Sequence, residues 1–242
     1  MPQATEVGRE HALIRLARSG RVLRTSRGAG HWLIVPLNAA RLGAPPLESW
    51  LDHYMTQALQ IPYLVGLLSA AEHHGASPYA VMQTLVFVPR PRRSVTVGRI
   101  QLVFHARDKL SQVPWTWHES ADGRLRVSTP EITSIDLIRF MSESGGLARV
   151  EAVLKDLLPI CQPAKLNEAL AVVQDITATQ RLGTLCALLG HNALGDTVER
   201  WLHGKATRLH WRALSPEQDK DERTSRDTRF RIWMPEKEDA GA

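Results

Sequence analysis

The sequence predicts an α+β fold, with a partial winged helix-turn-helix unit at the N-terminus followed by a mixed α/β domain with a helical C-terminal half. Three observations predict it. In residues 10–36, a short helical pattern precedes two strand-like segments that flank a glycine-containing turn. Helical patterns and buried strand patterns then follow one another up to Pro130. Beyond Pro130, apolar residues repeat with helical spacing to about residue 203.

The N-terminal unit is expected to consist of one helix and a two-stranded hairpin. Residues 10–19 have helical spacing, and Gly20 stands where a glycine commonly ends a helix. Residues 21–25 and 31–35 suit short strands, and the glycines of residues 26–30 permit the positive φ of a tight turn. The expected apolar face of the helix is formed by Leu13, Leu16 and Ala17.

The next part of the chain carries both helix and strand signals. Residues 38–47 contain two prolines and are expected to form a linker. Helices are expected at residues 47–59 and 63–74, and Gly75 ends the second. The expected strands lie at residues 84–88, 98–105, 115–119 and 124–128.

A clear helix start opens the C-terminal half. Thr129 is expected as N-cap, Pro130 at the first helical position, and Glu131 where the helix dipole favours a carboxylate. The core side of this helix is expected to be formed by Ile132, Ile135, Leu137 and Ile138. Further helices are expected at residues 147–158, from Pro163 onward, at residues 178–189 and at residues 194–202.

These patterns divide the chain into three parts. Residues 1–36 form the partial winged-helix unit, and residues 37–213 form the mixed α/β domain. Residues 214–242 are expected to be a polar tail, because residues 215–228 have almost no apolar side chains. Residues 229–233 are expected to add an edge strand.

Composition limits the class of protein. Hydrophobic residues make up 43% of the 242 residues, enough for a sizeable core. No segment approaches the roughly 20 apolar residues that a membrane helix needs, and the first ten residues have no apolar signal core. Cys161 and Cys186 lie in apolar helical patterns outside any metal-ligand spacing. We therefore expect a cytoplasmic protein with reduced thiols and no membrane partner.

Positive charge is concentrated at the N-terminus. Residues 1–30 contain six arginines and two glutamates, a net charge of +4, whereas the whole chain carries +5. The other 212 residues therefore carry only +1. Such a concentration is typical of a surface that binds a polyanion, although a solvated helix face gives the same pattern.

The basic helix and hairpin suggest DNA binding. In a winged helix-turn-helix, the recognition helix enters the major groove and the β-wing touches the adjacent backbone. Arginine suits both contacts, because its guanidinium can donate two hydrogen bonds to phosphate or guanine. The alternative is a small helix and hairpin that only pack on the main domain. The candidate DNA-binding residues are Arg15, Arg18, Arg21, Arg24 and Arg27.

Patterns for catalysis, cofactors or metals are weak. The adjacent His73 and His74 point about 100° apart on a helix and cannot share a metal ion. The glycines Gly28 and Gly30 precede a strand, which is the wrong context for a phosphate-binding loop. The acidic residues near 108–136 lack the spacing of a nuclease site. We therefore expect no enzyme, with no catalytic residue, no cofactor and no metal ligand.

Four segments resemble one known family. Thr129–Leu137 (TPEITSIDL), followed by Ser144–Leu147 (SGGL), is similar to a "TPE-x-T-x-x-DL … SGGL" segment of AbiEi-type antitoxins. Gln180–Gly183 (QRLG) resembles the arginine-leucine-glycine segment that follows in that family. Tyr63–Gly75 is similar to its apolar helix, and the hairpin ending at Val35–Pro36 is similar to its wing.

The resemblance implies a bacterial transcriptional autorepressor and antitoxin of a type IV toxin–antitoxin system. In that family, the N-terminal winged helix binds operator repeats in double-stranded DNA, and the C-terminal domain helps to neutralise a nucleotidyltransferase-like toxin. No catalytic residues are implied.

This sequence departs from the family at its N-terminus. Only nine residues precede residue 10, too few for the two helices that normally stand before the recognition helix. We therefore expect a truncated winged helix: either this homologue has lost its full DNA-binding domain, or the chain starts late. The alternative function is a protein-interaction antitoxin domain that binds the toxin without binding DNA.

Overall fold

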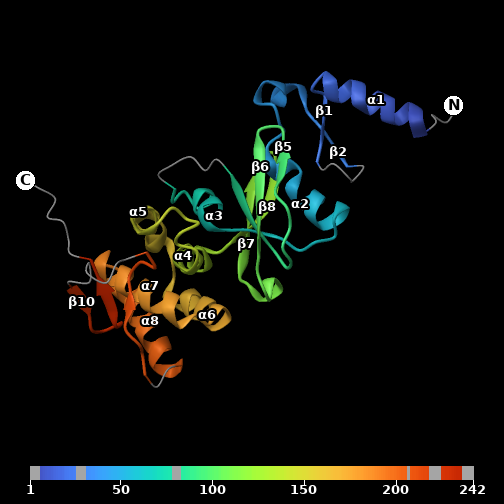
Figure 1. Ribbon diagram of the computed structural model, residues 1–242. Coiled ribbons are helices and arrows are strands. Elements are labelled where there is room, and N and C mark those ends of the chain that lie inside the picture. The colour runs from blue at the N-terminus through green and yellow to red at the C-terminus, as the bar shows by residue number, and fades with distance from the viewer. Residues whose placement is uncertain (1–5, 26–30, 78–82, 206–207, 218–224, 236–242) are drawn as a thin grey trace, which may run out of the picture. The chain divides into compact units, whose positions relative to one another are not determined.

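The computed structural model describes residues 6–25, 31–77, 83–205, 208–217 and 225–235. The fold is the predicted mixed α and β structure with a helical C-terminal half (Figure 1). The chain forms two compact units, each made of separate segments. The first unit comprises residues 1–65, 82–111 and 117–126, and the second comprises residues 66–81, 112–116 and 127–242. The domain boundaries expected after residues 36 and 213 stay predictions.

The first unit begins with the predicted helix and hairpin. Helix α1 (Glu6–Arg18) precedes strands β1 (Val22–Arg24) and β2 (Trp32–Ile34). The two strands pair antiparallel, with Leu23 opposite Leu33. The turn expected at residues 26–30 lies outside the described residues.

Most residues of a six-stranded sheet belong to the first unit. Strand β4 pairs parallel with β6, with Val86 opposite Phe104, and antiparallel with β3. Strand β5, which the sequence patterns did not predict, pairs antiparallel with β6. The strands in spatial order are β5 (Val95–Val97), β6 (Ile100–Ala106), β4 (Thr84–Val88), β3 (Leu64–Val65), β8 (Gly123–Ser128) and β7 (Trp115–Ser120).

The segment expected as one helix at residues 63–74 is a strand followed by a helix. Strand β3 comes first, and α3 begins only at Leu67 and ends at His73. Between them, Gly66 is extended and Leu67 has a φ of 53°. A short, wholly apolar run fits a buried strand as well as a buried helix, so its periodicity cannot separate them.

The helix expected at residues 47–59 is present as a series of short turns. It consists of the 3-10 helix η2 (Leu47–Ser49), one α-helical turn α2 (Leu51–His53) and the π-helical segment η3 (Tyr54–Ala58). The expected linker before it contains the 3-10 helix η1 (Leu37–Leu42). Leu51, Tyr54 and Met55 are buried, so this segment belongs to the core of the first unit.

In the second unit, the predicted helix start at Thr129 is confirmed. The Thr129 side chain accepts a hydrogen bond from the Ile132 backbone N–H, and Pro130 is the first residue of α4 (Pro130–Arg139). The four predicted core residues of α4 are fully buried. Helix α4 contacts α3, α5, α6 and α7, which makes it the central helix of this unit. The other helices are α5 (Leu147–Leu157), α6 (Pro163–Val173), α7 (Ile176–Leu188) and α8 (Asn192–Lys205).

A small three-stranded sheet ends the second unit. Its strands are β9 (Arg212–Ala213), β10 (Ser225–Asp227) and β11 (Ile232–Met234), in the spatial order β10-β11-β9. Strand β11 overlaps the edge strand expected at residues 229–233, but it is the middle strand of this sheet. Strand β10 lies in the segment expected to be a loop. The sequence patterns did not predict this strand because none of its residues is apolar.

Candidate nucleic-acid interface

Backbone hydrogen bonds cap the C-terminal end of α1, the helix of the candidate interface. The Gly20 N–H donates to the Ala17 carbonyl and the Arg21 N–H donates to the Leu16 carbonyl, at 3.0 and 2.9 Å. These two bonds form a Schellman motif, which requires the left-handed conformation that Gly20 adopts with a φ of 70°. The chain therefore turns sharply from α1 into β1.

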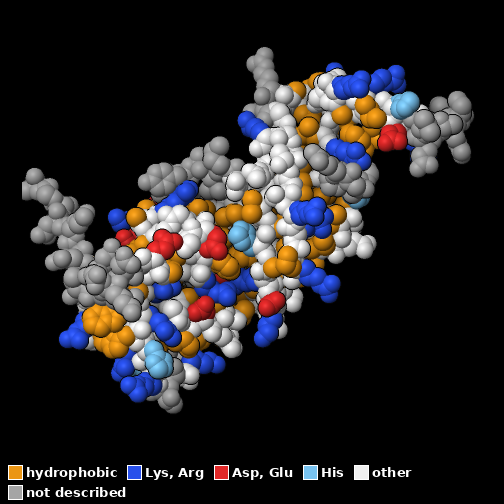
Figure 2. All heavy atoms as spheres, in the orientation of Figure 1, with side chains coloured by type: hydrophobic (Ala, Val, Ile, Leu, Met, Phe, Trp, Pro, Cys, Tyr) orange, Lys and Arg blue, Asp and Glu red, His pale blue; other side chains and the backbone are white. Residues whose placement is uncertain are grey.

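Two predicted DNA-binding residues stand in the last turn of α1. Arg15 and Arg18 are both exposed, and Figure 2 shows Lys and Arg side chains gathered over α1. Leu16, expected on the apolar face, is 43% exposed, and Ile14 is 39% exposed. The expectation was therefore wrong for Leu16, whereas Leu13 and Ala17 are half-buried.

The next two predicted residues follow along the hairpin. Arg21, directly before β1, and Arg24, the last residue of β1, are both exposed. The Arg24 guanidinium carbon lies 5.6 Å from the centroid of the Trp32 ring on the paired strand. Arg27, the fifth predicted residue, lies outside the described residues. The structure therefore puts four of the five candidates on one exposed helix-and-hairpin element.

Aromatic contacts hold the hairpin to the rest of the first unit. The Thr25 hydroxyl donates to the His31 carbonyl across the hairpin, at 3.1 Å. The His31 ring meets the Tyr54 ring edge-on at 6.4 Å between centroids, and Tyr54 lies 5.9 Å from Trp50. These residues, with Trp32, line a cavity of about 660 Å³. The end of the hairpin next to residues 26–30 is therefore anchored on Tyr54 of η3.

A second basic feature lies beside β1. Arg24 and Thr25 share the lining of a cavity of about 810 Å³ with Arg92 and Arg93 of the connection from β4 to β5. The sequence shows a basic turn there, to which its patterns assigned no function. A sequence signal for this basic feature was missed: no Asp or Glu occurs between Glu72 and Asp108.

A comparison with known protein families shows to which family the chain belongs. The AbiEi antitoxin C-terminal domain family matches residues 64–188, just over half of the chain. The chain belongs to the AbiEi antitoxin family. This confirms the resemblance found in the sequence, and it supports an antitoxin role in a toxin–antitoxin system. Among curated proteins, none matches the chain.

A solved structure shares the fold of this AbiEi-family chain. It is the RV2827C protein from Mycobacterium tuberculosis, with a TM-score of 0.63 and 15% sequence identity. The similarity covers 93% of this chain and 79% of that one. At this identity, the likeness shows the fold alone. None of the described helices is long and apolar enough to cross a membrane.

The motif around Thr129 serves the AbiEi fold. The carboxylate of Glu131 is 1% exposed, and its Oε1 accepts a hydrogen bond from the Gln162 backbone N–H at 2.9 Å. Gln162 is the N-cap of α6, so Glu131 joins α4 to the start of α6.

The QRLG motif likewise connects secondary-structure elements. The Gln180 amide donates to the carbonyls of His210 and Phe230, and Arg181 Nε donates to the Ala213 carbonyl. A Cβ atom on Gly183 would lie 2.4 Å from the Phe230 ring, so only glycine leaves room for this buried phenylalanine. The motif therefore attaches the C-terminal sheet to α7.

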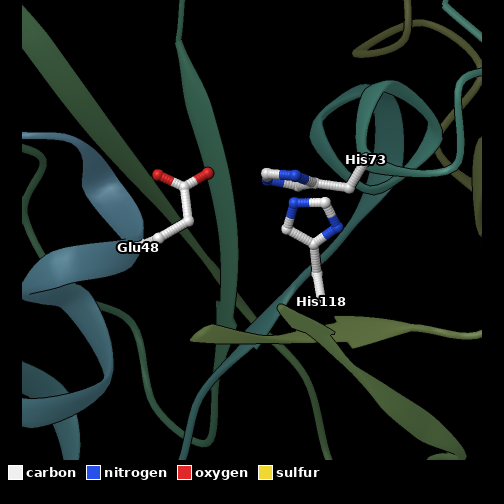
Figure 3. Close-up of side chains that lie close together, drawn as sticks. All are labelled: Glu48, His73 and His118. Carbon is white, nitrogen blue, oxygen red and sulfur yellow. The ribbon is translucent and has the colours of Figure 1, made fainter. Parts of the chain in front are cut away.

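One pair of possible metal ligands was also missed in the sequence. Figure 3 shows Glu48 from η2 and His118 from β7, both in the first unit, whose ligand atoms lie within 4.8 Å of each other. His73, the third labelled side chain, comes from α3 of the second unit. Two ligands from one unit fall short of the three that a catalytic zinc site uses, so we assign the pair no metal.

Proposed function

We propose that this AbiEi-family protein is a DNA-binding transcriptional autorepressor and antitoxin. The observation that supports DNA binding most is the arrangement of Arg15, Arg18, Arg21 and Arg24. All four are exposed on one helix and the hairpin that follows it. A helix followed by a wing, each bearing arginines, is the arrangement with which winged helices contact duplex DNA.

The two parts of the element would contribute differently. Arg15 and Arg18 in the last turn of α1 would reach base edges or phosphates in the major groove. Arg21 and Arg24, together with Arg27, would contact the backbone along the wing. Operator repeats near the gene's own promoter are the proposed target, and regulation of this kind takes place in the bacterial cytoplasm.

The antitoxin part of the proposal rests on family membership. We propose that the partner is a nucleotidyltransferase-like toxin and that the pair forms a type IV system. The protein would act by binding and regulation, without a catalytic residue, cofactor or metal of its own.

One observation favours a second candidate function. The family match begins at residue 64, so the helix and hairpin of residues 6–34 lie outside it. A protein-interaction antitoxin that binds the toxin without binding DNA would need only the matched part.

Two measurements separate the candidates. DNA from immediately upstream of the gene is titrated with the protein and followed by fluorescence anisotropy, and the tagged protein is tested for co-purification with the product of the neighbouring gene. Binding to both DNA and toxin supports the autorepressor and antitoxin. Toxin binding with no DNA binding at low salt selects the second candidate.

A further inference from the structure

The connection between β4 and β5 is unusually basic. Residues 83–107 contain five arginines and no acidic residue, and Arg90, Arg92 and Arg93 stand close together between two sheet strands. Pro89 and Pro91 restrict the backbone before these arginines, because proline fixes its own φ and limits the residue before it. The arginines are therefore carried on a stiff segment.

Two of these arginines share a cavity with the wing. The cavity of about 810 Å³ is lined by Arg24 and Thr25 of the hairpin, and by Arg92, Arg93, Ser94 and Thr96 of the β4–β5 segment. All of these residues belong to the first unit. The wing and the β4–β5 segment therefore form one surface, although about 65 residues separate them in the sequence.

The chemistry of this cavity fits an anion that carries phosphate. Three guanidinium groups line it, those of Arg24, Arg92 and Arg93. The Ser94 and Thr96 hydroxyls add hydrogen-bond donors, and no Asp or Glu occurs among the described lining residues. Arg92 is half-buried, with its guanidinium carbon 5.8 Å from the centroid of the Phe104 ring, which limits its freedom before a ligand binds.

We propose that Arg92 and Arg93, together with Arg24, form a second phosphate-binding site, which holds the phosphodiester backbone of the duplex that the wing contacts. The site rests on the proposed DNA-binding function, because Arg24 belongs to both surfaces. It extends the footprint on DNA from the helix and hairpin to the AbiEi domain. A strand of duplex DNA presents successive phosphates to such a row of arginines, whereas a free anion would engage the cavity alone.

The test compares the removal of charge inside and outside the cavity, in the full chain. Anisotropy titrations on the upstream duplex at several salt concentrations are run for the wild type, Arg92→Ala/Arg93→Ala and Arg99→Ala. Arg99 is also exposed and lies in the same acid-free stretch, but it does not line the cavity. The double variant should bind more weakly, and its slope of log K against log salt should become shallower by about 0.9 for each phosphate that the protein no longer neutralises. The Arg99 variant should keep the wild-type slope.

Four further measurements make the outcome decisive. Arg92→Lys/Arg93→Lys keeps the charge and should restore most of the salt slope, and circular dichroism checks that each variant is folded. An unchanged slope in the alanine variant, beside a wild type that binds, overturns this site and leaves the proposed function standing. A wild type that does not bind the duplex overturns both. Two other outcomes also contradict the site. In one, pyrophosphate binding requires Arg92 and Arg93 but duplex affinity does not. In the other, the double alanine variant loses only its binding to the toxin.

Discussion

The guanidinium carbon of Arg24 lies 5.6 Å from the centroid of the Trp32 ring, directly across the β1–β2 hairpin. Contact with the ring face limits the directions in which the Arg24 side chain can point. Because the pair is partly exposed, the Arg24 guanidinium still remains in contact with solvent. Arg24 is therefore presented to a ligand in a restricted set of conformations.

Trp32→Ala should weaken DNA binding although Trp32 carries no charge. Removal of the ring releases Arg24, and we expect a cost of about 0.5–1 kcal/mol in binding free energy. Trp32→Phe retains a ring and should lose less. Equal affinities for the wild type and both variants, measured by anisotropy, would show that the ring does not position Arg24.

Arg15→Ala/Arg18→Ala should reduce affinity for the upstream duplex more strongly. Removing an arginine that contacts a base edge costs about 1–3 kcal/mol of binding free energy. Arg200→Ala, which removes an exposed arginine of α8 in the other unit, is the control and should bind as the wild type does. Similar affinities for all three proteins would remove the last turn of α1 from the interface.

Gly183→Ala should destabilise the protein. The new methyl group would collide with the buried Phe230 ring, and overpacking of this kind costs about 1–3 kcal/mol. Gly204→Ala is the control, because its Cβ would meet nothing within 4 Å, and alanine favours a helix over glycine by up to about 1 kcal/mol. Urea unfolding measures both, and a stabilised Gly183 variant would contradict the packing described.

Alkaline pH should destabilise the fold through its two thiols. Burial raises the pKa of Cys161 and of Cys186 from 9.0 to about 12. Between these values, the unfolded thiols lose their protons while the folded thiols keep them, so the free energy of unfolding falls as pH rises. Burial also raises the pKa of the Tyr63 hydroxyl, which acts in the same direction.

Thermal unfolding from pH 9 to pH 12 checks this dependence, because these values bound the window between the unfolded and the folded pKa of the thiols. Cys186→Ala should reduce the slope of Tm against pH, whatever its effect on Tm at neutral pH. An identical slope in the variant and the wild type would contradict the assignment to the buried thiol.

Strong local signals predicted much of the fold. The cap at Thr129, the glycine at Gly20 and the hairpin strands were predictable, because each depends on residues close together in sequence. Strand β3 and strand β10 were missed, because one looks like a buried helix and the other has no apolar residue. The strand state of β3 comes from pairing with β4, which lies farther along the chain, and that of β10 comes from pairing with the nearby β11.

The candidate interface was predictable only in part. The basic N-terminal residues showed Arg15, Arg18, Arg21 and Arg24 as a group. The place of Arg92 beside Arg24 depends on how the β4–β5 segment folds against the hairpin, which no local pattern records. The charge of residues 83–107 taken alone would have indicated a second basic surface.

The central claim, that the helix and hairpin bind DNA, is tested most directly by one titration of the wild-type chain. Labelled duplex from immediately upstream of the gene is titrated at increasing salt, and binding is followed by anisotropy. We predict binding at low salt, with log K falling linearly as log salt rises, because arginine contacts release counterions from the phosphates. No binding at low salt, or affinity that does not change with salt, would contradict the account.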